Sequence, residues 1–387
     1  MSGLPLLGGL MADAFLRTHW QKKPLVVRQA IPGFTGFVSV DDLFRFAERK
    51  DVNARLVTMT KGKRQLRTAP IPRGARGALS GPWTVLVQGI EALHDEGWPL
   101  VRRFDGVVPR ARLDDLMISY ATEGAGVGAH TDRYDVFLLQ GEGKRRWRLQ
   151  SRGPIVVDER GAVPTVKDFR PEEEHVLEAG DMLYLPPGVV HEGTAVGGPC
   201  FTYSIGAVAP SVEGLLQNFL AFQSQRVVAT VDLASMYEDP DLTPPSAPSL
   251  IDDAMVKRAR AVLETVAPSD DAVSVFLGRL LTGPKPNVSF AAPQTPPTAE
   301  SVRRGLAEDG VVRLDRAARG LVRGARCFIA GEAYDVDASD VAWWSGLCDA
   351  RSAETPARLG PRSIDALVHA VGAGTIALRR RRERSSR

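Results

Sequence analysis

A series of short apolar segments between Leu116 and Val208 most strongly constrains the fold of this chain. The segments are rich in β-branched and aromatic residues and are separated by Gly, Pro or Asp clusters; they read LMISYAT, YDVFLLQ, RWRLQ, MLYLPP and CFTYSIGAV. Gly180 with Asp181, and the Pro-Pro-Gly sequence that ends at Gly188, supply turn chemistry between them. Short strands at this spacing predict a β-sandwich or β-barrel in the first half of the chain.

The second half is predicted to be mainly helical. Ser211 is a suitable N-cap, and the residues after it place Leu215, Leu216, Phe219 and Leu220 at helical spacing. Two more helices with apolar stripes are expected in DDAMVKRARAVLETVA and DDAVSVFLGRLL. These stripes should pack against the β-structure or against a second subunit. The proline-rich TGPKPNVSFAAPQTPPTAES predicts a domain boundary, and a small α+β unit of winged-helix size is expected after it.

The charge composition argues against a chain that binds nucleic acid through its overall field. The sequence has 49 Lys and Arg against 46 Asp and Glu, a net charge of +3 over 387 residues. The basic excess is partly local, because arginines crowd residues 379–387. Such a tail is usually a solvated end, and weak RNA contact is the alternative.

Cysteine usage and hydropathy indicate the compartment. Cys200, Cys327 and Cys348 are odd in number, far apart and without a Cys-x-x-Cys pair, which argues against a disulfide framework and against a structural zinc site. A reducing cytoplasm fits this pattern. The sequence has neither a signal-peptide pattern nor a run of 18 apolar residues, so we expect no membrane association.

Three residues have the types and spacing of an iron site. His130 and Asp132 stand two residues apart, so an extended segment places both side chains on one face. A similar pair occurs at His94 and Glu96, and taken alone such a pair is more often incidental. His191 follows a Pro-Pro-Gly turn at the start of another strand-like segment. Two imidazoles and a carboxylate form the ligand set of non-haem Fe(II) oxygenases, which leaves the opposite positions open.

An arginine close to this set suits the cosubstrate of such oxygenases. Arg145 lies one strand and a tight turn beyond Asp132, and its guanidinium can pair bidentately with the distal carboxylate of 2-oxoglutarate. Its neighbours Lys144 and Arg146 are also basic, so at least one of the three points to the other face. The alternative for each of them is a solvated surface cation.

At these residues the chain resembles the bacterial JmjC-domain ribosomal oxygenases of the cupin superfamily, which hydroxylate an arginine of large-subunit ribosomal protein sixteen. The resemblance is carried by HWQKKPLVVRQAIPGF, DDLMISY, GVGAHTDRYDVFLLQGEGKRRWRL and LEAGDMLYLPPGVVHEG. It implies an α+β architecture in three parts. These are a JmjC double-stranded β-helix, or jelly-roll, catalytic domain at 1–210, a helical dimerisation region at 211–283, and a winged-helix-like domain with a basic tail at 284–387.

The resemblance also implies roles for individual residues. Fe(II) would be held by His130, Asp132 and His191, with 2-oxoglutarate anchored by Arg145 and faced by Thr202. The substrate arginine would be held by Asp115 as guanidinium partner, by Met117 and Tyr134 as walls, and by Ser204 as a further polar contact. Without the resemblance, Asp115 reads as a turn acid, and Met117 and Tyr134 read as core. The chain departs from the family at Ala121, where the family can carry a hydroxyl residue near the cosubstrate.

The function that follows is that of an Fe(II)- and 2-oxoglutarate-dependent arginine 3-hydroxylase, with O2 as second cosubstrate and a ribosomal protein as partner. A homodimer is implied as well. Two alternatives remain open at this stage. Related JmjC enzymes with the same ligand set are histidine hydroxylases or demethylases, and only the pocket of Asp115 and Tyr134 favours arginine. The other alternative is a non-enzymatic cupin-like module that binds RNA or the ribosome.

Overall fold

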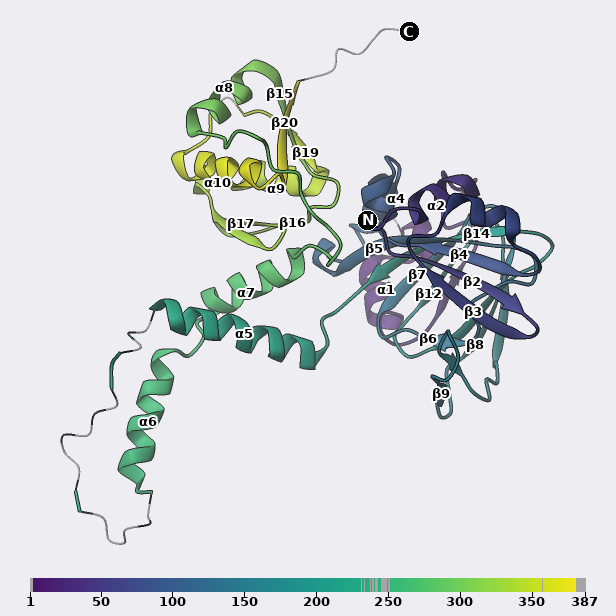
Figure 1. The fold of residues 1–387 in the computed structure, drawn as a ribbon, viewed down its shortest axis with the longest axis horizontal. Helices are drawn as coiled ribbons and strands as arrows, with labels where there is room; N and C mark the ends of the chain where they lie inside the picture. Colours follow the sequence, from purple (N-terminus) through teal and green to yellow (C-terminus); the bar gives the residue numbers. More distant parts are fainter. Residues whose placement is uncertain are drawn as a thin grey trace. The chain divides into compact units, whose positions relative to one another are not determined.

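In the computed structural model the chain forms two compact units, which are described separately (Figure 1). The structure describes residues 3–230, 251–356 and 358–380, together with isolated residues between 232 and 249. The first unit comprises residues 1–209 together with 284–289, and the second comprises 210–283 and 290–387.

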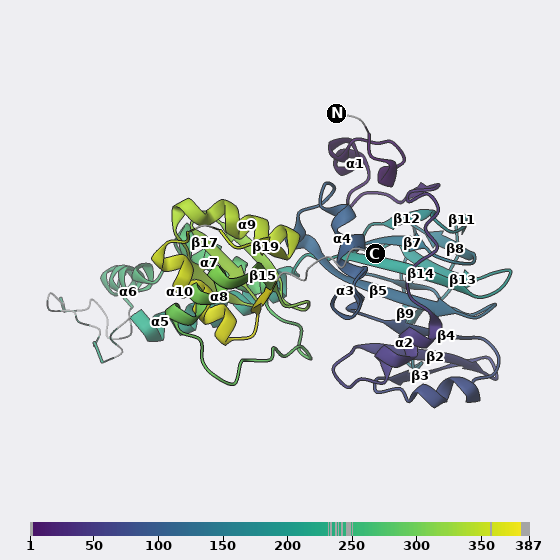
Figure 2. The same ribbon diagram turned by 90° about the horizontal axis from the view of Figure 1, so that it is seen from above.

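Two facing sheets build the first unit. The larger sheet has eight strands in the order β1-β12-β7-β14-β5-β4-β2-β3. Figure 2 labels the strands from β12 to β3 in this order. Its strands are β1 (Leu25–Val27), β12 (Met182–Leu185), β7 (Asp135–Gln140), β14 (Cys200–Ala207), β5 (Leu113–Ala121), β4 (Trp83–Val87), β2 (Ala54–Thr60) and β3 (Lys63–Thr68). The smaller sheet has the order β11-β8-β13-β6, with β11 (Glu173–Leu177), β8 (Arg145–Gln150), β13 (Val190–Ala195) and β6 (His130–Thr131). A separate hairpin pairs β9 (Val157–Asp158) with β10 (Thr165–Val166).

Strand β7 shows why the apolar segments of the sequence do not alternate with polar residues. All of its residues are buried, because both faces of the large sheet are covered. Val136 and Leu138 point into the space between the two sheets, where they pack with Leu149 and Leu185. The core on the opposite face is formed by residues such as Phe137, Leu139, Tyr184 and Tyr203, together with the N-terminal helices.

Short helices cover that outer face of the large sheet. They are η1 (Pro5–Leu7), α1 (Ala12–Thr18), α2 (Val40–Ala47), η2 (Arg73–Ala78), α3 (Ile90–Leu93), α4 (Gly97–Val101), η3 (Arg102–Phe104) and η4 (Arg110–Arg112). Phe15 of α1 and Phe104 of η3 contact Phe137, with ring centroids 6.0 and 4.8 Å away. Helix α2 begins with a capping box in which Ser39 and Asp42 exchange hydrogen bonds. The helices therefore leave the opposite, inner face for the site.

The second unit begins with three helices, α5 (Val212–Thr230), α6 (Asp253–Thr265) and α7 (Asp270–Thr282). The Ser211 hydroxyl accepts the Gly214 N–H, as an N-cap should. The stripe of α7 packs on the C-terminal core, because Gly278 lies directly against the Phe328 ring. Several large apolar residues of α5 and α6 are instead exposed; they are Val212, Leu216, Leu220, Val228, Met255, Val256, Val262 and Leu263.

The remaining elements form a small α+β unit of two three-stranded sheets, ordered β19-β15-β20 and β16-β17-β18. They are α8 (Ala299–Asp309), β15 (Gly310–Leu314), β16 (Gly320–Arg323), β17 (Arg326–Ile329), β18 (Glu332–Asp335), η5 (Ala338–Asp340), α9 (Val341–Ala350), β19 (Ser352–Glu354), α10 (Pro361–Gly372) and β20 (Ile376–Arg380). Trp344, Leu347 and Leu367 lie in its core. The α+β expectation for this part is met.

Two details differ from the sequence-based expectations. Arg379 and Arg380 belong to strand β20 and not to a solvated tail, whereas the arginines beyond them lie outside the described residues. The proline-rich segment is also more than a tether, because residues 284–289 belong to the same compact unit as the β-sheets.

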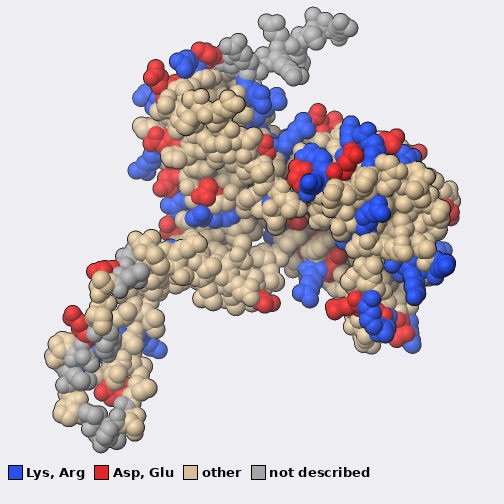
Figure 3. Space-filling model, in the orientation of Figure 1, with Lys and Arg blue, Asp and Glu red and all other residues tan. Residues whose placement is uncertain are grey.

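The charged residues on the surface and the hydropathy of the helices agree with two expectations from the sequence, a mixed surface charge and no membrane-spanning segment among the described residues. In Figure 3, Lys and Arg are interspersed with Asp and Glu on the face that is shown. Among the described residues, none of the helices is both long and apolar enough to cross a bilayer.

The aromatic cluster on the outer face yields a stability prediction. Phe137 is fully buried, and its ring lies 5.1 Å from that of Tyr184. We expect Phe137→Ala to lower the free energy of unfolding of the β-sheet unit by about 3 to 5 kcal/mol, because truncation leaves a cavity under the helices. Urea unfolding followed by tryptophan fluorescence measures this loss. The control Val176→Ala, at a residue 38% exposed, should cost less than about 1 kcal/mol; equal losses would contradict the prediction.

Candidate metal centre

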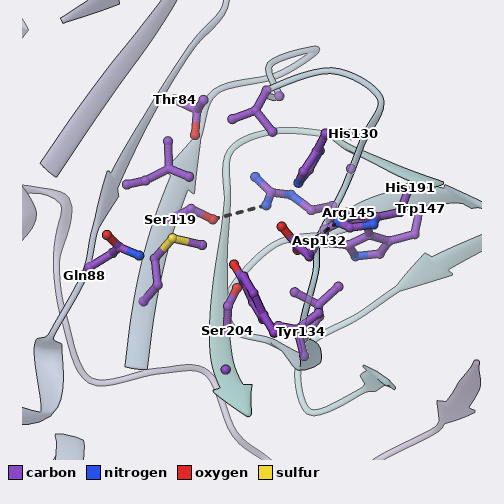
Figure 4. A pocket seen from close by; sticks show the side chains of 18 of the residues that line it. Thr84, Gln88, Ser119, His130, Asp132, Tyr134, Arg145, Trp147, His191 and Ser204 are labelled. Carbon is purple, nitrogen blue, oxygen red and sulfur yellow. Dashed lines mark hydrogen bonds and ion pairs between the residues drawn. The ribbon is translucent and has the colours of Figure 1, made fainter. Parts of the chain in front are cut away.

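A cavity between the two sheets contains the residues singled out from the sequence (Figure 4). Its empty space, counted with the solvent at its mouth, is ≈ 660 Å³. The lining residues come from both sheets, from the segments before and after β6, and from the residue that follows β4. They are Thr84, Leu86, Gln88, Asp115, Met117, Ser119, Gly126, Val127, His130, Asp132, Tyr134, Val136, Leu138, Arg145, Trp147, His191, Gly193, Ser204 and Gly206.

His130, Asp132 and His191 converge in this cavity. One ligand atom from each lies within 4.8 Å of the others, so a single ion could contact all three. His130 and His191 are directly opposite each other in the pairing of β6 with β13, and their ring centroids are 4.2 Å apart. His191 Nε2 is 3.6 Å from Asp132 Oδ2. In the part of the chain that the structure describes, this is the one cluster of three such residues with metal-site geometry.

Backbone carbonyls orient both imidazoles. His130 Nδ1 lies 3.0 Å from the Gly128 carbonyl oxygen, and His191 Nδ1 lies 3.0 Å from the Val189 carbonyl oxygen. Since a carbonyl oxygen only accepts, Nδ1 of each ring carries the proton and donates. Nε2 of each neutral ring then keeps its lone pair, which is the form that binds a metal ion.

Burial keeps His191 neutral. Burial, and then the neighbouring His130, lower the pKa of His191 to about 3. Burial also raises the pKa of Asp132, whereas the nearby His130 opposes that rise. The buried His191, the half-buried His130 and the half-buried Asp132 thus offer two neutral imidazoles and a carboxylate to one cation. The donor set therefore fits a divalent transition-metal ion.

Glycines before β6 allow this close packing. A Cβ on Gly126 would lie 2.2 Å from the Gly193 carbonyl oxygen, and Gly128 has a φ of +92°, which side chains disfavour. A glycine is therefore required at both positions for the backbone of this loop to approach its neighbours closely.

Arg145 reaches across the space between the sheets. It is 6% exposed, and its Nη1 donates to Ser119 Oγ at 3.1 Å, the dashed line in Figure 4. Its guanidinium carbon lies 5.7 Å from the centre of the Trp147 ring. Arg145 Nε and Trp147 Nε1 are buried donors without a hydrogen-bond partner among the described residues. Buried donors left in this state beside a cavity fit an anionic ligand.

The four residues expected to contact substrate line the same cavity. Met117 and Ser204 pair directly across β5 and β14, and Asp115 and Gly206 follow at the next inward-facing positions. Tyr134 lies near Asp132 at the same end (Figure 4). Asp115 is 8% exposed, so it is a buried acid and not the turn acid of the alternative interpretation.

Thr202 lies slightly apart from the others. It is buried in β14 directly opposite Ser119, and its hydroxyl donates to Gln140 Oε1 at 3.3 Å. It does not line the cavity itself. Of this pair, Ser119 is the residue whose hydroxyl lines the cavity. It lies two residues before Ala121, and sequence reasoning missed it.

Sequence reasoning also missed Trp147 and the contribution of β4. Thr84, Leu86 and Gln88 line the cavity from that strand and the residue after it. Their period-two spacing was the available signal, but nothing in the sequence indicated that β4 pairs with β5.

Comparisons with known proteins agree with this architecture. The JmjC domain family model matches residues 100–215, and the ROXA-like winged helix model matches 259–369. The chain is 31% identical to Ribosomal protein uL16 3-hydroxylase of Escherichia coli over 77% of this chain and 78% of that protein. It is 32% identical to a Probable ribosomal oxygenase of Haemophilus influenzae over 59% and 54%, respectively. The structure of YcfD, a ribosomal oxygenase from E. coli, in complex with cobalt and 2-oxoglutarate superimposes with a TM-score of 0.80 at 28% identity, covering 97% of this chain and 99% of that one.

The fold and the comparisons define a JmjC double-stranded β-helix of the cupin type, followed by a helical region and a ROXA-like winged helix. The chain belongs to the ribosomal oxygenase family. The sequence-based predictions of family, fold class and enzyme class are thereby confirmed.

The ligand geometry predicts how metal binding responds to substitution. His191→Ala removes one of three donors, so affinity for Co(II) or anaerobic Fe(II) should fall by more than about 100-fold, since loss of a mere supporting hydrogen bond already costs 10- to 100-fold. Calorimetric titration measures it. His175→Ala is the matched control, because His175 pairs with Glu173 on β11 outside the cavity. Unchanged affinity in His191→Ala would exclude this site.

Proposed function

We propose that this chain is an Fe(II)- and 2-oxoglutarate-dependent protein hydroxylase that acts on an arginine of ribosomal protein uL16. One observation carries the proposal. A triad of metal-ligand type, a buried arginine and a buried aspartate line a single cavity, as Figure 4 illustrates for the triad and Arg145. The activity is further supported by the name of the E. coli relative, uL16 3-hydroxylase.

His130, Asp132 and His191 would hold the ferrous ion. Three protein ligands on one side leave the remaining positions for the cosubstrate and O2. Bound iron would supply the oxidising chemistry that couples decarboxylation of 2-oxoglutarate to insertion of one oxygen atom into a C–H bond. The carbonyls of Gly128 and Val189 keep the two imidazoles in the ligating tautomer.

Arg145 would anchor 2-oxoglutarate by its distal carboxylate. Its buried guanidinium is held in place by Ser119 and by the face of Trp147, so little side-chain freedom is lost when the anion binds. Thr202, directly across from Ser119, would support this end of the site from outside the cavity. A carboxylate bound there neutralises a cation that otherwise lies buried.

Asp115 would receive the guanidinium of the substrate. Tyr134 and Met117 offer an aromatic face and a polarisable thioether to its alkyl stem, and Ser204 adds a hydroxyl between them. Together these residues direct the stem of the side chain toward the metal ligands. A carboxylate at the end of the cavity favours a cationic side chain over the neutral imidazole of a histidine substrate.

Other parts of the proposal concern assembly and location. We place the protein in the cytoplasm, where its ribosomal substrate is made. The exposed apolar residues of α5 and α6 support a homodimer formed through the helical region. Weak RNA contact by the arginines after Arg380 would add affinity for the ribosome.

Turnover of a uL16 peptide tests the proposed function. With Fe(II), 2-oxoglutarate and O2, the wild-type chain should release succinate in proportion to peptide and add one oxygen atom to an arginine, as read by tandem mass spectrometry. His130→Ala should lose both signals. Oxygen on a histidine, or loss of a methyl group from lysine, would indicate the related JmjC activities. RNA binding that weakens steeply with salt, without succinate, would indicate a binding module.

The anchor residue predicts a separate kinetic effect. Arg145→Lys replaces a planar two-donor fork by a single ammonium, so the KM for 2-oxoglutarate should rise by about 10- to 100-fold, as expected for loss of a charged bidentate contact. Succinate release at varied 2-oxoglutarate measures this. Arg146→Lys serves as control, because Arg146 does not line the cavity. Equal KM values for both variants would contradict the assignment.

A further inference from the structure

Lys285 contacts the substrate end of the cavity from a distant part of the sequence. It lies just after α7, in the segment 284–289 that belongs to the β-sheet unit. Its Nζ is 3.2 Å from Asp115 Oδ2 and 3.3 Å from Asp114 Oδ2. Asp115 is the buried acid that lines the cavity, whereas the side chain of Lys285 is 40% exposed. Lys285 of the same chain therefore pairs with Asp115, the carboxylate that would bind the substrate guanidinium in the proposed function.

The surroundings of Asp115 explain why a cation is needed there. Glu91 of α3 is buried behind it, and its Oε2 accepts the Leu116 N–H at 2.9 Å. Burial, and then the charge of Asp115, raise the pKa of Glu91 to about 7, and Lys285 opposes this rise. The carboxyl groups of Glu91, Asp114 and Asp115 thus lie close together. Without a nearby cation, their mutual repulsion would favour protonation of a carboxyl group.

We propose that Lys285 is the resting counter-ion of Asp115, and that a guanidinium substrate side chain takes its place when it binds. The inference rests on the proposed function and names a residue that tunes substrate affinity. In the unloaded protein Lys285 keeps the buried carboxylate paired, because an uncompensated buried charge is costly. On substrate binding its flexible stem returns the ammonium to water, which is inexpensive for a side chain already partly exposed.

This exchange sets a threshold for cationic ligands. A guanidinium gains two parallel N–H···O bonds when it replaces an ammonium. A lysine side chain would exchange one ammonium for another and gain little. Lys285 therefore weakens every cationic ligand by the same factor, which leaves arginine bound and lysine below useful affinity.

Steady-state kinetics of Lys285→Met tests the proposal. With the arginine-containing uL16 peptide, KM should fall by about fivefold, the scale of one partly exposed ion pair, while kcat stays unchanged. The same peptide with lysine in place of arginine should become a better competitive inhibitor by the same factor. Lys285→Arg retains a competing cation and should keep KM at or above the wild-type value. A KM that is unchanged or higher in Lys285→Met would overturn the proposal.

Two controls make the result specific. Lys144→Met removes the same charge from an exposed pair with Glu178, and it should leave the peptide KM unchanged. In an Asp115→Asn background, Lys285→Met should have no further effect, because there is no carboxylate to compete for; a persisting fivefold gain would refute competition at Asp115. Failure of the proposed function itself would look different, since the wild-type chain would then release no peptide-dependent succinate.

Discussion

The pairing of β6 with β13 is the constraint on which the site depends. It puts His130 and His191 directly opposite each other, at the separation where side chains on one face of an antiparallel pair touch. Asp132 follows His130 at the next position on the same face. A shift of register by one residue would turn one histidine out of the cavity. β13 also pairs with β8, so the register that aligns the histidines also places Ala195 opposite Arg145 and Gly193 opposite Trp147.

The two sheets divide the work between them. The small sheet and the residue that follows β6 supply the candidate metal ligands, and the small sheet also supplies Arg145. The large sheet supplies Ser119, Met117 and Ser204. Arg145 connects the two through its hydrogen bond to Ser119. The large sheet can serve as a fixed wall because aromatic residues and helices bury its outer face. The precision of the site thus rests on packing that lies behind it.

Much of the site could be predicted from sequence because its residues follow strand periodicity. His130 and Asp132 are close in the chain, and the Pro-Pro-Gly turn before His191 predicts the start of a strand there. Ser119 and Gln88 could not be found in this way, because their roles depend on which strands are neighbours in the sheet. The contact of Lys285 with the site was even harder to predict from the sequence. It lies in a proline-rich segment whose composition predicts a linker, and only the folded chain places it on Asp115.

Charge separation within the cavity gives the site a direction. Arg145 and Asp115 are both nearly fully buried, yet among the described residues they do not pair with each other. Among the described residues, Arg145 donates a hydrogen bond to Ser119 and its Nε has no partner, whereas Asp115 lies beside the partly exposed ammonium of Lys285. A buried charge held apart from its opposite costs stability, and a ligand of opposite charge recovers that free energy on binding. In the proposed function an anion would bind at Arg145 and a cation at Asp115, with the candidate metal ligands lining the same cavity. That arrangement would order both reactants before any chemistry takes place.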